Sequence, residues 1–470
     1  MKNVVVITAD SVRADHLGLY GYPRSTTPRM SEISNRAVFK NAWANAPYTP
    51  ASMPSLFASQ YLLEDGHLAL RDHSTVQDHL ENSETRTCLV NSNIQLDRFG
   101  CTDGWDNVID FSLIDSNNRH SSQKTIIKNI ASQILSHNRT PKQISAIIND
   151  LYHKFAGPAQ PHPQDSRLIA AGKEWLDGQD SPFYLHLHLM NTHHPYYFSP
   201  GTFEKVSDFS FDENRYARLL QRALTHVKDG EFVWSLDQNQ RQYIVDAYDA
   251  SIRELDSLIA DFISDIDLSE TSVVFTSDHG EELWDHGHFG HTGYIEKPRQ
   301  TTLYEEVLNI PMVIFENDYR KEVVETPVTL LDIAPTIVDI TAGESICHEF
   351  RGKSLNKISG SSDNLSRPVL AQATSPGEPT HYAQYQDRHR LTAVKIRKKK
   401  LINNERSGDK FYNLSTDSSE CENVICNSSP SQKHRELANK YLSSNSSTET
   451  MGEHSLDRGT EETLKDLGYL

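Results

Sequence analysis

The segment Thr276–His291 reads T-S-D-H-G-E-E-L-W-D-H-G-H-F-G-H and follows a short apolar run, Ser272–Phe275. Such a run is typical of a strand buried in a parallel sheet. Asp278 and His279 are then at the carboxyl end of a strand, where open α/β sheets bind ligands, and the conformationally permissive Gly280 follows them. A buried carboxylate is costly without a cation, and a carboxylate beside an imidazole suits a divalent metal. The segment predicts half of a metal site, with a solvated polar loop as the alternative.

A second carboxylate of such a site stands at the start of the chain. Asn3–Ala9 is a β-branched run that predicts another strand, and Asp10 follows it directly. The alternative role of Asp10 is to cap the helix that comes next. Because both strands end in a carboxylate, Asp10 and Asp278 are expected at the same edge of the sheet.

The stretch Ala46–Ser59, A-P-Y-T-P-A-S-M-P-S-L-F-A-S, predicts a helix. Pro50 suits the first position of a helix, which makes Thr49 the expected N-cap. A hydroxyl there faces free backbone N–H groups and the positive end of the helix dipole, where an anionic ester binds well. Metal coordination would lower the pKa of this hydroxyl and make it a nucleophile. The alternative is that Thr49 is a cap and nothing more.

A third strand is predicted at Phe183–Met190, F-Y-L-H-L-H-L-M, in which polar and apolar residues alternate. It delivers His193 at its carboxyl end, and an imidazole there is suited to protonating a leaving alkoxide. Two adjacent histidines in a loop are, alternatively, surface residues. His186 and His188, within the strand, are expected to be structural.

Three segments together resemble the sulfatase branch of the alkaline phosphatase superfamily: Asp10–Gly18, Ala46–Ser59 and Asp278–Glu281. The nucleophile motif of that branch is Cys or Ser, x, Pro, x, Arg, and its first position falls on Thr49. Because neither Cys nor Ser is there, no formylglycine is expected, and the motif's Arg falls on Met53. The rival nucleophiles lie further along the helix, at Ser52 and Ser55.

The resemblance also implies roles for single residues. Thr49 would be the nucleophile, His193 the leaving-group acid, and His291, at the position of a family lysine, would cover the developing charge. One divalent metal would be bound by four residues: Asp10, Thr49, Asp278 and His279. This ligand set suits Ca²⁺, Mg²⁺ or Mn²⁺, and the imidazole also admits Zn²⁺.

The order of the expected elements predicts an alkaline-phosphatase-like α/β fold with a largely parallel central sheet flanked by helices. Residues 1–345 are expected to form the catalytic domain, and residues 346–440 a C-terminal α+β subdomain with a small antiparallel sheet. Residues 441–470 are expected to be a mobile tail. Within the subdomain, the basic run Lys398–Lys400 is interpreted as a solvated strand edge.

Composition limits the partners. The chain carries 46 Lys and Arg against 64 Asp and Glu, a net charge of −18, which argues against nucleic acid or an anionic membrane as main partner. The five cysteines form no zinc pattern and indicate reduced thiols. No apolar run reaches membrane-spanning length, and the first, Val4–Ile7, is too short for a signal sequence. A cytoplasmic location is therefore expected, while the oligomeric state stays open.

The expected function is metal-dependent hydrolysis of a sulfate or phosphate ester, either a small anionic ester or a sulfated or phosphorylated glycan. One alternative is transfer of a phosphoglycerol- or phosphoethanolamine-type group onto a glycan or lipid, which a Thr nucleophile favours and the lack of an anchor disfavours. A non-catalytic binding protein on the same scaffold is disfavoured because the strand-tip ligands are retained.

Overall fold

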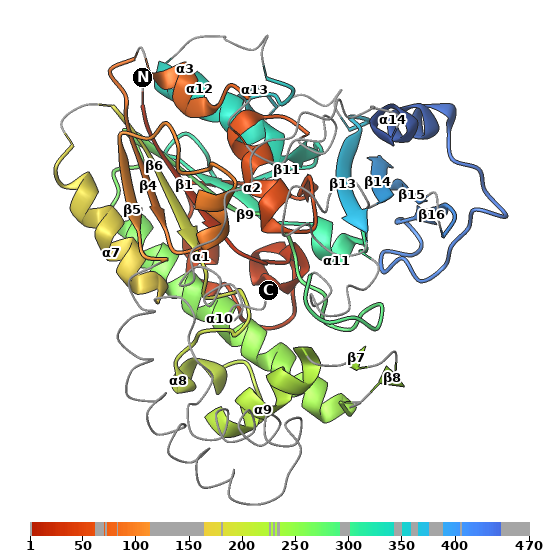
Figure 1. Ribbon diagram of the computed structural model, residues 1–470. Helices are drawn as coiled ribbons and strands as arrows, with labels where there is room; N and C mark the ends of the chain where they lie inside the picture. Colours follow the sequence, from red (N-terminus) through yellow and green to blue (C-terminus); the bar gives the residue numbers. More distant parts are fainter. Residues whose placement is uncertain are drawn as a thin grey trace, which may run out of the picture.

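An eight-stranded sheet forms the centre of the molecule, in the order β11-β2-β10-β9-β1-β6-β4-β5 (Figure 1). Its strands are β1 (Asn3–Ala9), β2 (Arg36–Phe39), β4 (Arg86–Asn91), β5 (Asn107–Asp110), β6 (Phe183–Leu189), β9 (Thr271–Ser277), β10 (Met312–Phe315) and β11 (Glu322–Val324). β1 pairs in parallel with β9 and β6, whereas β10 is antiparallel to both of its neighbours. The largely parallel sheet confirms the predicted fold class.

The computed structural model describes residues 2–61, 70, 73–81, 83–112, 164–179, 182–224, 227–228, 231–232, 236–291, 301–342, 350–358, 365–375, 389–404 and 407–442. The predicted mobile tail therefore lies outside the described residues from 443 onward. The predicted domain boundaries remain predictions.

Helices cover both faces of the sheet (Figure 1). One face packs against α2 (Thr49–Ala58), α3 (Val76–Leu80), α4 (Ile94–Arg98), α11 (Glu305–Leu308), α12 (Ile333–Ala342) and α13 (Leu355–Ile358). The other packs against α1 (Pro28–Glu32), α7 (Asp165–Leu176), α8 (Pro200–Phe203), α9 (Glu213–Leu224) and α10 (Gln238–Ser264). Within β1, Val4 and Val6 face the first set, and Val5 and Ile7 face the second. Burial on both faces is why β1 carries four consecutive apolar residues, Val4–Ile7, instead of alternating apolar and polar ones.

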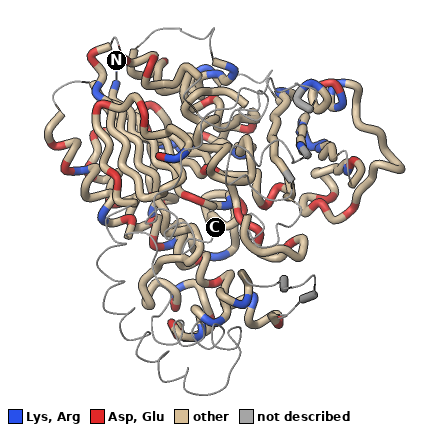
Figure 2. Tube along the Cα trace, viewed as in Figure 1, with Lys and Arg blue, Asp and Glu red and all other residues tan. Residues whose placement is uncertain are grey.

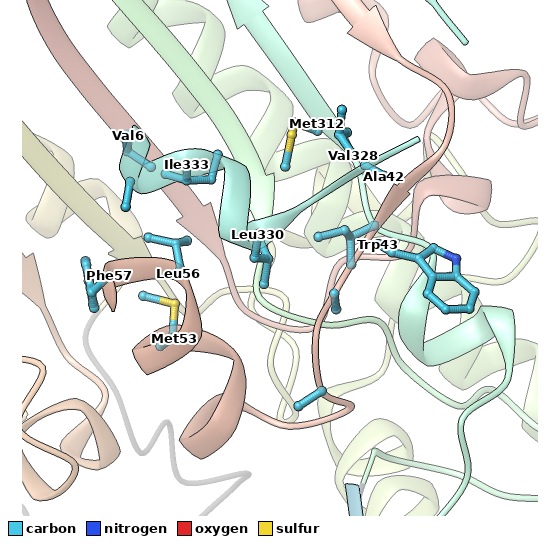
Figure 3. Close-up of a cluster of buried hydrophobic side chains, with 14 of the residues drawn as sticks. Val6, Ala42, Trp43, Met53, Leu56, Phe57, Met312, Val328, Leu330 and Ile333 are labelled. Carbon is cyan, nitrogen blue, oxygen red and sulfur yellow. The ribbon is translucent and has the colours of Figure 1, made fainter. Parts of the chain in front are cut away.

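Short elements complete the main body. They are the 3-10 turns Ala14–His16, Gly18–Tyr20 and Leu330–Asp332, and the paired strands β3 (Ala42–Trp43) with β12 (Val328–Thr329) and β7 (Val227–Lys228) with β8 (Glu231–Phe232). Helix α2 is buried at every position. Figure 3 shows Met53, Leu56 and Phe57 of α2 in one apolar cluster with Leu330 and Ile333. This packing fixes the helix whose first residue is Thr49.

A four-stranded antiparallel sheet forms the C-terminal part: β13 (Val369–Ser375), β14 (His389–Ile396), β15 (Lys399–Asn404) and β16 (Lys410–Asn413). One face packs under α14 (Gln432–Leu442) through residues such as Val394 and Ala438. The other face joins the core of the main body through Ala371 and Ala393. This separate antiparallel sheet was also predicted.

The basic run in this sheet differs from its prediction at one residue. Lys398 and Lys399 are exposed, whereas Lys400 is fully buried. Its Nζ lies 3.1 Å from Oε1 of Glu305 and 2.8 Å from Oε1 of Glu420. The interpretation as a solvated edge is wrong here because β15 lies between two strands and successive residues of a strand face opposite sides.

Two observations concern the predicted partners: the distribution of charged residues along the chain and the composition of the helices. Figure 2 shows acidic and basic positions interspersed along the described chain, without a continuous basic stripe in that view. None of the described helices combines the length and the apolar composition that a membrane crossing requires.

Candidate active site

Two neighbouring strands bring the predicted metal ligands together. Asp10 follows β1, and Asp278 and His279 follow β9, which pairs with β1 in parallel. One ligand atom from each of the three residues lies within 4.8 Å of the others, and all three side chains are fully buried. The carboxyl edge of the sheet therefore holds two carboxylates and an imidazole in one cluster.

Thr49 points its hydroxyl into this cluster. Its Oγ1 lies 2.7 Å from Oδ2 of Asp278, 3.2 Å from Oδ2 of Asp10 and 3.2 Å from Nε2 of His279. The expectation that Thr49 is the N-cap is wrong: the helix begins at Thr49, and the cap is Tyr48, whose side chain makes no capping bond. The hydroxyl is thereby left to the carboxylates instead of the helix backbone.

The Asp-His-Gly sequence fixes the orientation of the imidazole. Nδ1 of His279 lies 2.8 Å from the carbonyl oxygen of Gly280. That carbonyl accepts the Nδ1 proton, so Nε2 offers its lone pair to the cluster. Gly280 is needed for a close approach, because a Cβ there would lie 2.1 Å from the carbonyl oxygen of Glu306. This differs from the conformational freedom expected of that glycine.

The turn after β1 places two more donors at the carboxylates. Ser11 has a φ of 64°, the left-handed region that is uncommon for residues other than glycine. Its backbone N–H donates to Oδ1 of Asp278 (3.2 Å), and its hydroxyl donates to Oδ1 of Asp10 (2.7 Å). The hydroxyl of Tyr248 donates to the Ser11 carbonyl and accepts from the N–H of Arg13. The turn is thus held by a side chain of helix α10.

Asp10 has two further partners that sequence reasoning missed. Nδ2 of Asn93 donates to Oδ2 of Asp10 at 3.3 Å, and Nε2 of His188 lies 3.6 Å from the same oxygen. His188 was expected to be structural, but it reaches the cluster from the end of β6. The available signal was position: each residue lies at or just after the carboxyl end of a strand next to the site.

The electrostatics of the two carboxylates differ. Burial alone would raise the pKa of Asp10, but His193, His188 and His279 lower it well below its usual value. Burial and the neighbouring Asp10 raise the pKa of Asp278. The two carboxylates outweigh the effect of burial on His279 and raise its pKa. Within the described part of the chain, no Lys or Arg side chain pairs with Asp10 or Asp278.

A group of histidines lies beside the cluster. His193 is buried; its ring stacks on His194 with centroids 4.5 Å apart and meets His291 edge-on at 5.4 Å. His291 in turn lies 4.3 Å from His279, between ring centroids. Nδ1 of His291 is 3.2 Å from Oε1 of Glu281. The structure thus brings every predicted site residue to one edge of the sheet.

The family of the chain follows from its similarity to one family of known proteins. The sequence model of the sulfatase family matches residues 2–343. The chain belongs to the sulfatase family. It is therefore a hydrolase acting on ester bonds, within the alkaline phosphatase superfamily.

Individual relatives of this sulfatase-family chain are distant. An arylsulfatase of Clostridium perfringens is 23% identical over 460 residues, which cover 90% of each chain. The multifunctional alkaline phosphatase superfamily protein PehA of Trinickia caryophylli is 28% identical over 196 residues, only 36% of each chain. The phosphonate monoester hydrolase of Silicibacter pomeroyi has the same fold, with a TM-score of 0.65 and 16% identity over 94% of each chain.

Sulfatase-family enzymes depend on a metal, and the strand-tip cluster fits one. Three oxygens and one imidazole nitrogen converge there, from Asp10, Asp278, Thr49 and His279. Two adjoining buried carboxylates repel each other and lose their hydration, a cost that a divalent cation offsets. The ligand types admit Ca²⁺, Mg²⁺, Mn²⁺ or Zn²⁺.

Proposed function

We propose that this sulfatase-family hydrolase cleaves phosphate and sulfate esters with Thr49 as its nucleophile. Asp10, Thr49, Asp278 and His279 would hold one divalent metal. The supporting observation is that Oγ1 of Thr49 lies within 3.2 Å of a ligand atom of each of the other three. A hydroxyl within hydrogen-bond reach of carboxylates and an imidazole has the surroundings expected of an activated nucleophile.

The chain's own residues would divide the chemistry among them. The bound metal would lower the pKa of the Thr49 hydroxyl and polarise the ester. The Thr49 hydroxyl, having lost its proton to solvent, would bond through its oxygen to phosphorus or sulfur, and the bond to the leaving alkoxide would break as that alkoxide takes a proton from His193. Water would then displace the Thr49 oxygen from phosphorus or sulfur and give a proton to His193. His291 would lie next to the reacting group.

The rival nucleophiles are held elsewhere. The hydroxyl of Ser52 donates to the carbonyl of Ala46 at 2.8 Å, and that of Ser55 donates to the carbonyl of Ala51 at 2.6 Å. Both hydroxyls are thus hydrogen-bonded to main-chain carbonyls, one within α2 and one in the segment that precedes it. Met53, at the position of the family arginine, is fully buried in the apolar cluster of Figure 3.

The nucleophile bears on the choice of ester. A hydrated aldehyde can expel sulfate by collapsing to a carbonyl, whereas a sulfated threonine must be hydrolysed by water. We expect phosphate esters to be turned over faster than sulfate esters. Among the structural neighbours are phosphonate monoester hydrolases and a protein solved with its substrate D-glucosamine-2-N,6-O-disulfate. Anionic esters, including glycan esters, are therefore the class to test first.

Replacement of Thr49 tests the nucleophile. Thr49→Ala should abolish turnover of a phosphate ester panel, while Thr49→Ser should retain part of it. Ser55→Ala is the matched control: it removes a buried hydroxyl from the same helix and should leave turnover near the wild-type level. Metal content, measured by elemental analysis, should show metal still bound to Thr49→Ala. Substantial turnover by that variant with metal bound would contradict the covalent mechanism.

Metal binding is tested separately at Asp278. Asp278→Asn removes a charged oxygen ligand and should weaken binding of the first metal. Elemental analysis after dialysis at a fixed free concentration of Mn²⁺ should show the loss. Equal metal in the wild type and the variant would mean that Asp278 is not a ligand.

Transfer of a phospho-alcohol group is a second candidate. The phosphatidylethanolamine transferase Mcr-2 of Escherichia coli is 23% identical over 351 residues, 73% of this chain and 54% of that protein, and a threonine nucleophile suits such transfer. Product analysis with added glycan or alcohol acceptors separates the two functions. A transferase would form acceptor-linked product in preference to the hydrolysed ester.

A further inference from the structure

Three side chains beside the first cluster form a second group of metal-type ligands: His194, Glu281 and His291. One ligand atom from each lies within 4.8 Å of the others. Nδ1 of His291 is 3.2 Å from Oε1 of Glu281, and Nδ1 of His194 is 3.6 Å from Oε2. Two imidazoles thus present the same ring nitrogen to opposite oxygens of one carboxylate.

Hydrogen bonding accounts for only one of these two contacts, the 3.2 Å contact of His291 with Glu281. The 3.6 Å separation of His194 and Glu281 is too long for a hydrogen bond, and the buried Nδ1 of His194 has no hydrogen-bond partner among the described residues. An ion bound at roughly 2.1 Å by N and O ligands in a tetrahedral site keeps those atoms about 3.4 Å apart. The observed separations of 3.2 and 3.6 Å lie on either side of that value.

The charges of the site point the same way. Asp10, Asp278 and Glu281 are fully buried, and none of them pairs with a Lys or Arg side chain in the part of the chain that the structure describes. Arg13 reaches only the main-chain carbonyl of Glu281. One divalent cation balances Asp10 and Asp278 and leaves Glu281 uncompensated. A second divalent cation balances the charge of Glu281. The site then has a net positive charge, which attracts an anionic ester.

Other side chains support the second group and connect it to the first. The hydroxyl of Tyr196 donates to Oε2 of Glu281 at 3.3 Å, as outer-shell donors orient ligating carboxylates. The hydroxyl of Ser11 lies between the groups, 2.7 Å from Oδ1 of Asp10 and 3.5 Å from Nδ1 of His291. Two cations would therefore flank the same reacting group.

We propose that His194, Glu281 and His291 bind a second divalent cation beside the one held by Asp10, Asp278 and His279. Two imidazole nitrogens and one carboxylate, whose two oxygens each face one imidazole, are a ligand set for Zn²⁺ or Mn²⁺. The second cation supplies the positive charge that the family lysine would bring to the position of His291. This inference concerns the same site as the proposed function but does not depend on Thr49 being the nucleophile.

Metal counting tests the proposal without any activity assay. Full-length protein is stripped with a chelator, re-equilibrated with Zn²⁺ or Mn²⁺ alone, and its metal content measured by elemental analysis and calorimetric titration. The wild type should bind two ions per chain. Glu281→Gln and His194→Ala should each bind one. The control His286→Gln, which alters a His–Glu pair on Glu306 at 2.9 Å, should still bind two.

The outcomes separate the two metal sites. The Asp278→Asn variant should lose the ion of the first site and keep that of the second. The Glu281→Gln variant should lose the ion of the second site and keep that of the first. If the wild type binds one ion that survives Glu281→Gln but not Asp278→Asn, the second site is refuted and the first stands. If the single ion is lost in Glu281→Gln only, the second site stands and the first is refuted. His194→Ala serves as the second variant if Glu281→Gln fails to fold by circular dichroism.

Discussion

Among the described residues, histidine and hydroxyl side chains, instead of lysine and arginine, contact the buried carboxylates of this site. His188 and His279 lie within 4 Å of Asp10, and Thr49 and Ser11 contact its carboxylate through their hydroxyls. Neutral imidazoles and hydroxyls bring no fixed positive charge. At the scale of single residues, we therefore expect bound metal or protonated histidine to supply positive charge for an anionic substrate.

His193 is expected to supply a proton to the leaving group. Its replacement in His193→Ala should slow hydrolysis of alkyl esters by about 10²–10⁴-fold, the usual contribution of a general acid. Activated aryl esters, which leave without a proton, should be affected far less. The measurement is kcat/KM for a series of phosphate esters of increasing leaving-group pKa. An equal loss across the series would indicate that His193 positions the substrate instead.

The sequence could place those site residues that directly follow an apolar strand or open a helix. Asp10, Asp278 and Thr49 are of this kind. Their neighbours Asn93 and His188 could not be found in the same way, because their contribution depends on which strands pair. β6 lies next to β1, and β4 next to β6, only in the folded sheet. The pairing order is a tertiary property that no local pattern carries.

At the scale of elements, one carboxylate joins the start of α7 to the end of β6. Oδ1 of Asp165 accepts the N–H of Met190 at 2.7 Å, and Oδ2 accepts the N–H of Asn191 at 3.0 Å. The loop that carries His193 begins here. Despite the two donors, burial raises the pKa of Asp165 to about 7. The folded state therefore favours the protonated carboxyl, whose oxygens both keep a lone pair for an N–H.

Asp165→Asn should destabilise the protein by roughly 1–3 kcal/mol at pH 5, since the amide nitrogen cannot accept a hydrogen bond. The pKa of Asp165 is raised on folding, so its stabilisation is complete below about pH 4 and is lost as pH rises through about 7. The difference in the free energy of unfolding between the wild type and Asp165→Asn should therefore be smaller at pH 8 than at pH 5. Urea unfolding at both pH values measures this difference. A difference that grows with pH would show that Asp165 is ionised in the folded state.

Most elements of the core followed from sequence patterns. The predicted strand Asn3–Ala9 is β1, and the segment Asp237–Ile263, whose apolar residues recur at helical spacing, forms α10 from Gln238 onward. The first pattern is a β-branched run and the second a long helical periodicity, so local propensity and burial agree. The cap of α2 was misplaced by one residue because Pro50 is tolerated at the second helical position as well as the first. At its position, the Thr49 hydroxyl donates to the carboxylates of Asp10 and Asp278 and does not cap the helix backbone.

At the scale of the whole molecule, a buried ion cluster joins the C-terminal sheet to the main body. Nζ of Lys395 and Nζ of Lys400 lie 3.0 and 3.1 Å from the two carboxylate oxygens of Glu305, at the start of α11. Trp43 of the main body donates its indole N–H to Glu305 at 3.1 Å. Both ammonium groups also lie over the Trp43 ring, within 5.0 Å of its centroid. Glu305 therefore adds a charged contact to the apolar packing that joins the sheet to the main body.

Glu305→Gln should loosen this docking, because among the described residues it leaves Lys395 with no ion-pair partner and Lys400 with Glu420 alone. Breaking a buried pair on one side costs about 3–5 kcal/mol, and the loss should be seen by urea unfolding at pH 7. Burial raises the pKa of Glu305, but the two lysines lower it to about 2. Its stabilisation is therefore present above about pH 4.5 and is lost as pH falls toward 2, so the difference in the free energy of unfolding between the wild type and the variant should narrow in acid.

The control Asp409→Asn, which breaks the exposed pair with Arg435, should change stability by less than about 1 kcal/mol. Equal unfolding of Glu305→Gln and the wild type at pH 7 would show that apolar packing alone holds the sheet.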